Sequence, residues 1–487
     1  MTRINQFKSG IKWSLVGQFS TLIFEFFFGV VLARILSPSD FGLIAILSVF
    51  IMISQIIINS GLNQSLVRDR FVGEIDYSTI FFLNIIIGSS TYFVLFIIAP
   101  IISSYFSLPK ITLLLRVVGL SVILSSLSIV YKAILTKNFK FKSLNNVIII
   151  SSVISGICAI TLALNGAGVW SLIFKTLINY LITLFLLVIA TSWTPKFIFS
   201  KSIIVKHWNF AKNLLASGLL GWIYKDVFAL MIGRIISIDF LGFYNRSEML
   251  RNLVTNNIES VITSSSYPVL ASLQDDKEAF LRLVVQTMKY TFLIVGLTLA
   301  FLFSTAEPLI EFLLGAKWLY SAKILKYLTL VGFTMPLCSI MINAISVYGR
   351  SDLYLKLQFY YSIYVLGTLI FAFIFGENIF LVSLVVSSLI GYVHTIFVFK
   401  KIYDYSIYNH FKELKAKIFI IVIEITILSF IRLILKDFSP FTILLTLFSS
   451  FLIMILIYLK LYRDKELISI FNSTMRILKL KGFSQNL

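Results

Sequence analysis

The feature that most constrains this chain is a series of long runs without one charged residue. They lie at 77–103, 143–174, 176–195, 290–306, 327–349, 357–376 and 438–459. Each run is close to, or longer than, the roughly 20 residues that an α-helix needs to cross the hydrocarbon core of a bilayer. Charged residues make up 13% of the 487-residue chain, about half of their share in soluble domains. We therefore expect an all-α integral membrane protein.

The apolar runs and the stretches between them predict about fourteen transmembrane helices. We expect these at 11–33, 41–65, 77–103, 111–135, 144–165, 168–192, 208–235, 241–270, 288–306, 319–347, 353–375, 379–399, 416–435 and 439–460. The basic opening is followed by an apolar run that continues to Leu36 without a cleavage pattern, so the first helix is expected to remain. Cys158 and Cys338 lie in apolar runs and the three histidines are scattered. This predicts no disulfide, metal site or cofactor.

The net charge of +20 is distributed unevenly about the predicted spans. With the N-terminus placed in the cytoplasm, most Lys and Arg residues fall in inner segments, near 137–142, 196–212 and 400–417 and in both tails. The predicted outer loops hold Arg34, Lys110, Arg234, Lys317, Arg432 and Lys436. This asymmetry follows the positive-inside rule, so we expect cytoplasmic termini and attribute the charge to topology, not to nucleic-acid binding.

A short motif recurs after 200 residues. "LARILSPSDFG" (32–42) and "MIGRIISIDFLG" (231–242) both carry an arginine, a serine and a glycine at a turn between two helices. Six predicted spans separate the copies, so both lie on the same side of the membrane. The repeat predicts two pseudo-symmetric six-helix lobes in parallel orientation, at 1–200 and 201–402, with two further helices and a basic tail at 403–487.

Polar residues recur at three- and four-residue steps inside several predicted spans, which places them on one face of each helix. Examples are Ser171, Lys175 and Asn179 in the sixth span and Asn252, Asn256 and Glu259 in the eighth. Such faces avoid lipid, so they predict either a hydrated cavity or contacts between helices. For the ionisable residues well inside spans we favour a cavity, and for those near span ends we favour anchoring at the membrane surface. The first group is Glu25, Lys175, Lys225 and Asp226; the eighth span adds Arg246, Arg251 and Glu259; the second group includes Arg34 and Arg234.

Several strings in the chain resemble the Wzx-type flippases of the polysaccharide-transporter family, and most closely their colanic-acid and lipopolysaccharide exporter branch. They are "LARILSPSDFG" (32–42), "LTKNFKFK" (135–142), "GAGVWSL" (166–172), "IGRIISIDFLGFYNR" (232–246), "SYPVLASLQDD" (266–276) and "YGRSDLYLK" (348–356). They occur in the order of the family and cover roughly residues 1–400. The family's motif positions fall on Arg34, Asp40, Gly42, Arg234, Gly242 and Arg246, which we expect to be mostly structural.

This resemblance implies a member of the multidrug/oligosaccharidyl-lipid/polysaccharide exporter superfamily, with two lobes around an alternating-access cavity. The implied cargo is an oligosaccharide repeat unit linked to undecaprenyl diphosphate, moved across the bacterial inner membrane for surface polysaccharide synthesis. The implied partners are that lipid-linked cargo, membrane lipids and a polysaccharide polymerase. In this hypothesis Lys175, Lys225, Arg246 and Arg251 contact the diphosphate, while Glu25, Asp226 and Glu259 pair with cations or relay protons.

Two other functions compete with this hypothesis. A cation-coupled multidrug antiporter of the same superfamily would have an acidic, aromatic cavity, whereas the polar faces here are rich in cations. A membrane enzyme such as a polymerase would need a sizeable outer loop, and the sequence contains none that could fold as a domain. No GxxxxGK[ST] motif for binding ATP and no HExxH metal motif is present. We therefore expect a transporter and not an enzyme.

Overall fold

The computed structural model describes residues 3–59, 61–69 and 71–462, and its chain forms two compact units, Met1–Asn245 and Arg246–Leu487. The first unit contains α1 (Arg3–Ile35), α2 (Pro38–Asn59), α3 (Leu62–Arg68), α4 (Glu74–Phe106), α5 (Lys110–Lys137), α6 (Phe141–Leu164), α7 (Val169–Thr191), α8 (Lys201–Ile235) and the start of α9 (Ile238–Ser272). The second contains the rest of α9, α10 (Lys277–Leu314), the 3₁₀ turn η1 (Ala316–Trp318), α11 (Leu319–Gly332), α12 (Met335–Val347), α13 (Ser351–Tyr403), α14 (Ile407–Ile434) and α15 (Pro440–Tyr462). The prediction of an all-α chain is confirmed.

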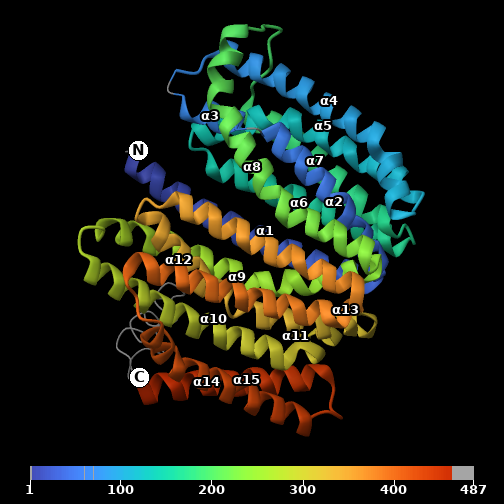
Figure 1. The fold of residues 1–487 in the computed structure, drawn as a ribbon. Helices are drawn as coiled ribbons and strands as arrows, with labels where there is room; N and C mark the ends of the chain where they lie inside the picture. Colours follow the sequence, from blue (N-terminus) through green and yellow to red (C-terminus); the bar gives the residue numbers. More distant parts are fainter. Residues whose placement is uncertain (1–2, 60, 70, 463–487) are drawn as a thin grey trace. The chain divides into compact units, whose positions relative to one another are not determined.

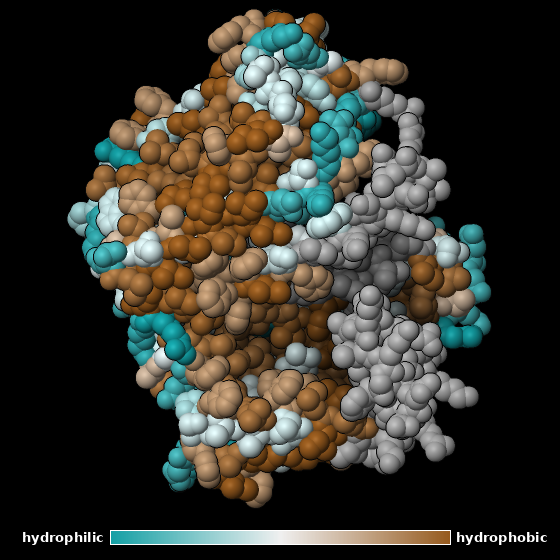
Figure 2. Space-filling model, turned by 180° about the vertical axis from the view of Figure 1, so that it is seen from behind, coloured by the Kyte–Doolittle hydropathy of each residue, from teal (hydrophilic) through white to brown (hydrophobic). Residues whose placement is uncertain are grey.

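Within the described residues, nine helices are long and apolar enough to cross a bilayer. α13 is 53 residues long and combines two predicted spans, joined by a kink at Gly376. Side chains on the outside are predominantly apolar, and Figure 2 shows a mostly hydrophobic face with hydrophilic residues in scattered patches. The chain is therefore a multi-pass membrane protein. The total of fourteen spans stays a prediction.

In the first unit, α4 packs along α5, α6 packs along both α1 and α7, and α2 packs against α5 and α8 (Figure 1). Small residues allow these close approaches. A Cβ added at Gly156 of α6 would lie 2.4 Å from the ring of Phe28 in α1, and one at Gly88 of α4 would lie 2.4 Å from the Ser126 hydroxyl of α5. Because lipid is as apolar as a leucine side chain, helices in a membrane associate largely through such close packing.

The two copies of the repeated motif meet in this unit. Ser37 caps α2: its hydroxyl accepts from the Asp40 amide at 3.2 Å, and the Asp40 carboxylate accepts from the Ser37 amide at 3.0 Å. Ser237, the equivalent residue, accepts from the Phe240 amide at 3.0 Å. Both turns therefore satisfy the free amides at a helix start in the same way.

The glycine of each copy lies against the backbone of the other. A Cβ at Gly42 would lie 2.0 Å from the Ile238 carbonyl oxygen, and a Cβ at Gly242 would lie 2.1 Å from the Pro38 carbonyl oxygen. Pro38 and Ile238 are also 200 residues apart, so the contact is reciprocal, as between two parts related by a twofold axis. Only glycine allows backbones to approach this closely.

In the second unit, α10 packs against α11, α12, α14 and α15, and α13 packs against α11 and α12. The predicted span at 319–347 lies within one candidate membrane span, Ala316–Val347, in which η1 is followed by α11 and α12 with a break between the two helices. Pro336 lies in the first turn of α12 and has no amide hydrogen to continue the preceding helix. The kink in α13 has φ 78° and ψ −171° at Gly376, a conformation that is essentially restricted to glycine.

Candidate functional site

Two residues that the sequence places inside spans form an ion pair in the first unit. The Lys175 ammonium of α7 lies 2.5 Å from the Glu25 carboxylate of α1. The Ser152 hydroxyl of α6 donates to the other carboxylate oxygen of Glu25 at 2.8 Å. Side-chain exposure is 17% for Lys175 and 43% for Glu25, so the pair borders open space and is not sealed in the core. One cation and one anion thus meet where three helices converge.

The neighbouring polar residues of α6 and α7 bond to one another. The Asn179 amide donates to the Ser155 hydroxyl at 3.3 Å, and the Thr183 hydroxyl donates to the Ser151 hydroxyl at 2.9 Å. These residues continue the polar face of α7 that begins at Lys175. For this part of the polar face the structure supports contact between helices and not a hydrated cavity, because these side chains hydrogen-bond to each other across α6 and α7.

A polar cavity of about 690 Å³ lies in the second unit, between α9, α12 and both halves of α13. Two of its residues, Asn256 and Glu259, belong to the polar stripe that the sequence predicts on the eighth span. Ser339 of α12 donates a hydrogen bond to the Glu259 carboxylate. The Tyr364 hydroxyl and the His394 Nδ1 lie 3.1 Å apart and join the two halves of α13. The remaining polar lining consists of Thr334, Asn343, Tyr354, Gln358, Tyr361 and Thr395.

The predicted arginines lie on α9 but do not line this cavity. Arg251 is 6% exposed, and its guanidinium lies 3.3 Å from Glu248 and donates to the Asn252 side-chain oxygen at 2.7 Å. Arg246 lies near the sulfur of Met249, at 3.4 Å. Lys225 and Asp226 belong to a stretch of α8 whose side chains fall outside the described part of the structure. Among the described residues, the lining of this cavity therefore holds one carboxylate and no Lys or Arg, and the cation-rich cavity between two lobes stays a prediction.

The residues of the repeated motif are structural in their contacts. The Asp40 carboxylate accepts a hydrogen bond from the Ser37 hydroxyl in the helix cap, and Gly42 and Gly242 form the close backbone contact. The Arg234 guanidinium lies over the Tyr105 ring at 5.5 Å. These contacts agree with the expectation that the motif anchors a turn.

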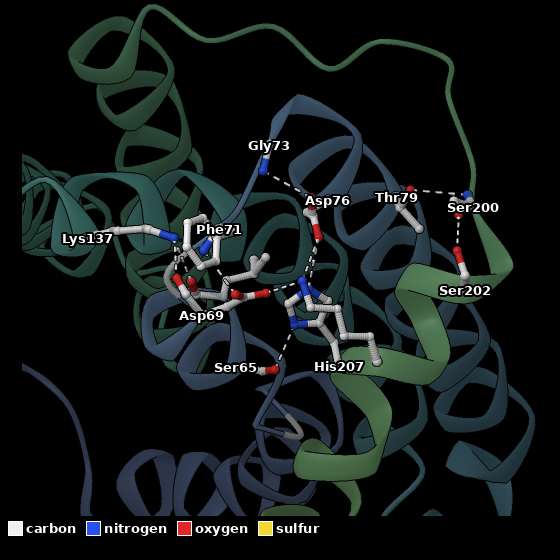
Figure 3. A network of polar contacts seen from close by, with 12 residues as sticks. Ser65, Asp69, Phe71, Gly73, Asp76, Thr79, Lys137, Ser200, Ser202 and His207 are labelled. Atoms are coloured by element: carbon white, nitrogen blue, oxygen red, sulfur yellow. Dashed lines mark hydrogen bonds and ion pairs between the residues drawn. The ribbon is translucent and has the colours of Figure 1, made fainter.

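A polar network that the sequence did not reveal joins the start of α8 to α3 and α4 within the first unit (Figure 3). His207 is 1% exposed, with Nδ1 at 2.7 Å from the Ser65 hydroxyl and Nε2 at 3.4 Å from the Asp76 carboxylate. Lys206 forms ion pairs with Asp69 and Asp76. Its hydrogen bond to Asp69 lowers the pKa of that carboxyl below the ordinary value, and the same bond raises the pKa of Lys206.

Asp69, Asp76 and His207 are also the one described group of side chains whose potential metal ligands lie close together, within 4.8 Å. The Lys206 ammonium supplies the positive charge that these carboxylates require. The segment before α8 adds to the attachment, because the Lys196 and Ser200 amides donate to the Ser78 and Thr79 hydroxyls. The network is therefore explained as a structural fastening of α8 to α3 and α4.

A family model described as "Polysaccharide biosynthesis protein" matches residues 31–323, more than half of the chain. The chain belongs to this polysaccharide biosynthesis family. Proteins similar to it include the succinoglycan biosynthesis transport protein ExoT of Rhizobium meliloti, 23% identical over 70% of this chain and 69% of the relative. The teichuronic acid biosynthesis protein TuaB of Bacillus subtilis is 23% identical over 72% of each chain. The lipopolysaccharide biosynthesis protein WzxC of Escherichia coli is 21% identical over 72% of this chain and 71% of its own.

The fold of this polysaccharide biosynthesis protein has solved counterparts. The lipid II flippase MurJ, in an inward closed conformation, superposes with a TM-score of 0.70 and 17% identity, covering 93% of this chain and 99% of that chain. An inward-facing multidrug transporter of the MATE family superposes with a TM-score of 0.59 and 14% identity, covering 80% and 96%. The predicted membership in a polysaccharide biosynthesis family is confirmed by the family match, and the superpositions show that the chain shares the fold of these two transporters.

Sequence reasoning missed most of the cavity lining in the second unit. A usable signal existed in α13, where Tyr354, Gln358 and Tyr361 recur at steps of four and three residues and so share one helical face. Because tyrosine is grouped with the apolar residues when apolar runs are identified, a row of tyrosines is not recognised as a polar face. His394 carries no local signal, because its partner Tyr364 lies 30 residues earlier and meets it only through the turn at Gly376.

Proposed function

We propose that this protein is a flippase that moves oligosaccharide repeat units, linked to undecaprenyl diphosphate, from the cytoplasmic to the outer leaflet of a bacterial inner membrane. The observation that carries the proposal is a polar cavity of about 690 Å³ inside a bundle of membrane helices whose sequence belongs to a polysaccharide biosynthesis family. The names of the similar proteins, which concern succinoglycan transport, teichuronic acid and lipopolysaccharide, support a saccharide cargo.

The lining of the cavity suits a carbohydrate. Tyrosine rings such as Tyr361 offer flat apolar surfaces for the C–H face of a sugar ring, and Asn256 and Gln358 offer amides that both donate and accept hydrogen bonds. The Glu259 carboxylate accepts from hydroxyl groups, as it already does from Ser339. The volume lies within the range of about 300–1,000 Å³ that is usual for small-molecule sites.

For the anionic part of the cargo we assign Lys175 first. Its ammonium already holds one carboxylate, Glu25, at a partly open position, and a diphosphate is a stronger partner than a carboxylate for such a cation. In this proposal the cargo displaces Glu25 from Lys175 during alternating access. Lys225, Arg246 and Arg251 are further diphosphate contacts, and Asp226 and Glu259 pair with cations or relay protons as the lobes at 1–200 and 201–402 exchange states.

The orientation follows from the charge distribution along the sequence, with both termini in the cytoplasm. Cargo is then loaded from the cytoplasmic leaflet and delivered outside, where a polysaccharide polymerase consumes it. The lipid part of the cargo stays in contact with membrane lipids throughout, because exposing an isoprenoid chain to water would cost about 0.8 kcal/mol for each CH₂ group.

A deletion strain tests the proposed function directly. We expect undecaprenyl-linked repeat units to accumulate in the inner leaflet, as measured by mass spectrometry of extracted lipids, and surface polysaccharide to be lost. Lys175→Glu and Arg246→Glu variants should fail to restore export while reaching wild-type levels in the membrane. Normal surface polysaccharide in the deletion strain contradicts the proposal, and full activity of both charge reversals contradicts the diphosphate assignment.

The alternative, a cation-coupled antiporter for drugs or small molecules, is supported by one specific observation. The cavity in the second unit is aromatic and contains the acidic Glu259 without a lining Lys or Arg, which is the character that suits a cationic drug. The similarity of the protein's fold to that of a MATE-family multidrug transporter is compatible with the antiporter alternative. Increased drug sensitivity of the deletion strain, with unchanged lipid-linked sugars, would favour the antiporter.

A further inference from the structure

A second, apolar hollow adjoins the polar cavity on α13. It has a volume of about 400 Å³ and is lined by Ile363, Gly367 and Phe371 from the first half of the helix and by Ile379, Val386 and Ile390 from the second. Tyr364 lines both this groove and the polar cavity. The two spaces therefore lie on either side of Tyr364, with polar residues lining one and hydrocarbon side chains lining the other. We call the second space the α13 groove.

Besides Tyr364, three residues with hydroxyl groups line the α13 groove, but their hydroxyls are not available to a polar ligand. Thr368 donates to the Val365 carbonyl at 2.6 Å, Ser383 to the Phe380 carbonyl at 2.7 Å, and Ser387 to the Leu384 carbonyl at 2.9 Å. Each of these three hydroxyls thus already donates its hydrogen to a backbone carbonyl of its own helix. The surface offered to an occupant is hydrocarbon, so the occupant is an apolar chain.

Gly367 keeps the α13 groove open. A Cβ added there would meet no atom within 4 Å, so no close approach of backbone requires glycine. A glycine inside a helix lowers stability by about 0.5–1 kcal/mol relative to alanine. At this position the missing side chain leaves the groove unfilled. The rim faces outward, with Ile363 exposed by 45% and Val386 and Ile390 each by 48%, which opens the groove to the lipid phase.

From this shared wall, and building on the proposed function, we propose that the α13 groove binds the isoprenoid chain of the carrier lipid next to its phosphate. In the state in which the cargo rests on the second unit, before or after its contact with Lys175, the phosphate lies at the junction, against the Tyr364 hydroxyl and His394, and the sugars occupy the polar cavity. The groove follows nine residues of helix, from Ile363 to Phe371, or about 12 Å along the helix axis. That length holds only the first few isoprene units, and the rest of the chain remains in the bilayer.

The test measures binding of undecaprenyl phosphate to the purified full-length protein in nanodiscs of phosphatidylcholine and phosphatidylglycerol. Gly367→Leu places a helix-favouring apolar side chain in the groove, at a position where the added Cβ meets no atom within 4 Å, and we expect at least tenfold weaker binding. Ile370→Trp is the matched control: Ile370 lies on the same half of α13, is 62% exposed and does not line the groove. It should bind within twofold of wild type. Both variants should show the thermal stability of wild type.

Two further arms identify the junction and the occupant. Tyr364→Phe and His394→Gln should weaken binding of undecaprenyl phosphate several-fold and leave binding of undecaprenol, which lacks the phosphate, unchanged. An excess of phosphatidylglycerol should not displace the probe. Wild-type affinity in Gly367→Leu, or displacement by phosphatidylglycerol, overturns the groove assignment while the proposed function stands. Absence of lipid-linked sugars in the deletion strain overturns the proposed function, whatever the groove binds.

Discussion

The reciprocal glycine contact between the two motif copies gives the sharpest prediction about this fold. Substituting Gly42 by alanine places a methyl group 2.0 Å from the Ile238 carbonyl oxygen, and Gly242→Ala places one 2.1 Å from the Pro38 carbonyl oxygen. Real Cβ atoms essentially never approach closer than 3.0 Å, so each carbonyl would have to move by about 1 Å. The obstacle in both cases is backbone, which cannot rotate away as a side chain does.

The magnitude follows from two opposing effects. Overpacking a well-packed contact typically costs about 1–3 kcal/mol, and loss of the close approach removes weak Cα–H···O contacts of about 0.5–1 kcal/mol. The better helix propensity of alanine offsets up to about 1 kcal/mol. We expect a net destabilisation of about 1–3 kcal/mol for either substitution. Gly42→Ala combined with Gly242→Ala should cost less than the sum, because the first substitution already separates the two helix starts.

The assay is thermal unfolding of the purified protein in detergent, combined with surface polysaccharide in a complemented deletion strain. Each single variant should lower the apparent Tm by a few degrees. Gly367→Ala is the control: it makes the same chemical change inside a helix, but its Cβ meets nothing within 4 Å. It should leave the Tm unchanged or slightly higher. Equal Tm values for Gly42→Ala, Gly242→Ala and Gly367→Ala would refute the reasoning.

Three further predictions follow from the ionisable groups. Glu25→Gln should retain most export and Lys175→Gln should lose it, because only the latter removes the cation for the diphosphate; equal losses, measured by surface polysaccharide, would show a purely structural ion pair. Lys206→Gln should lower stability by a few tenths to about 1 kcal/mol at pH 7, since this pair is partly exposed. Asp69 has a folded pKa below its unfolded value, so the pair's contribution is complete above the unfolded pKa and is lost as the pH falls through the folded pKa. A wild-type advantage in Tm that acidification does not reduce would contradict this. Glu259→Gln should keep the hydrogen bond from Ser339 and the fold but abolish any dependence of transport on the proton gradient, as measured in proteoliposomes at two internal pH values.

The sequence predicted the helical membrane class because hydrocarbon can accept only segments whose backbone groups are all bonded internally, and long charge-free runs have no other stable location. It also predicted the repeat, since Ser37 and Ser237 cap their helices through neighbours three residues away. Local hydrogen bonds of this kind are encoded by adjacent residues and need no tertiary information. The stripe through Asn256 and Glu259 was visible for the same reason, as a regular step along one helix.

Partners distant in sequence were decided only by the tertiary structure. Glu25 and Lys175 are separated by 150 residues, and nothing in either segment specifies that α1, α6 and α7 bring them to 2.5 Å. His207 looked like a scattered histidine until α8 placed it beside Ser65, 142 residues earlier, and Asp76. The cavity and the α13 groove likewise depend on the turn at Gly376, which folds two halves of one long helix together. Periodicity reports which face of a helix is polar, but the helix that meets this face is chosen by packing over the whole bundle.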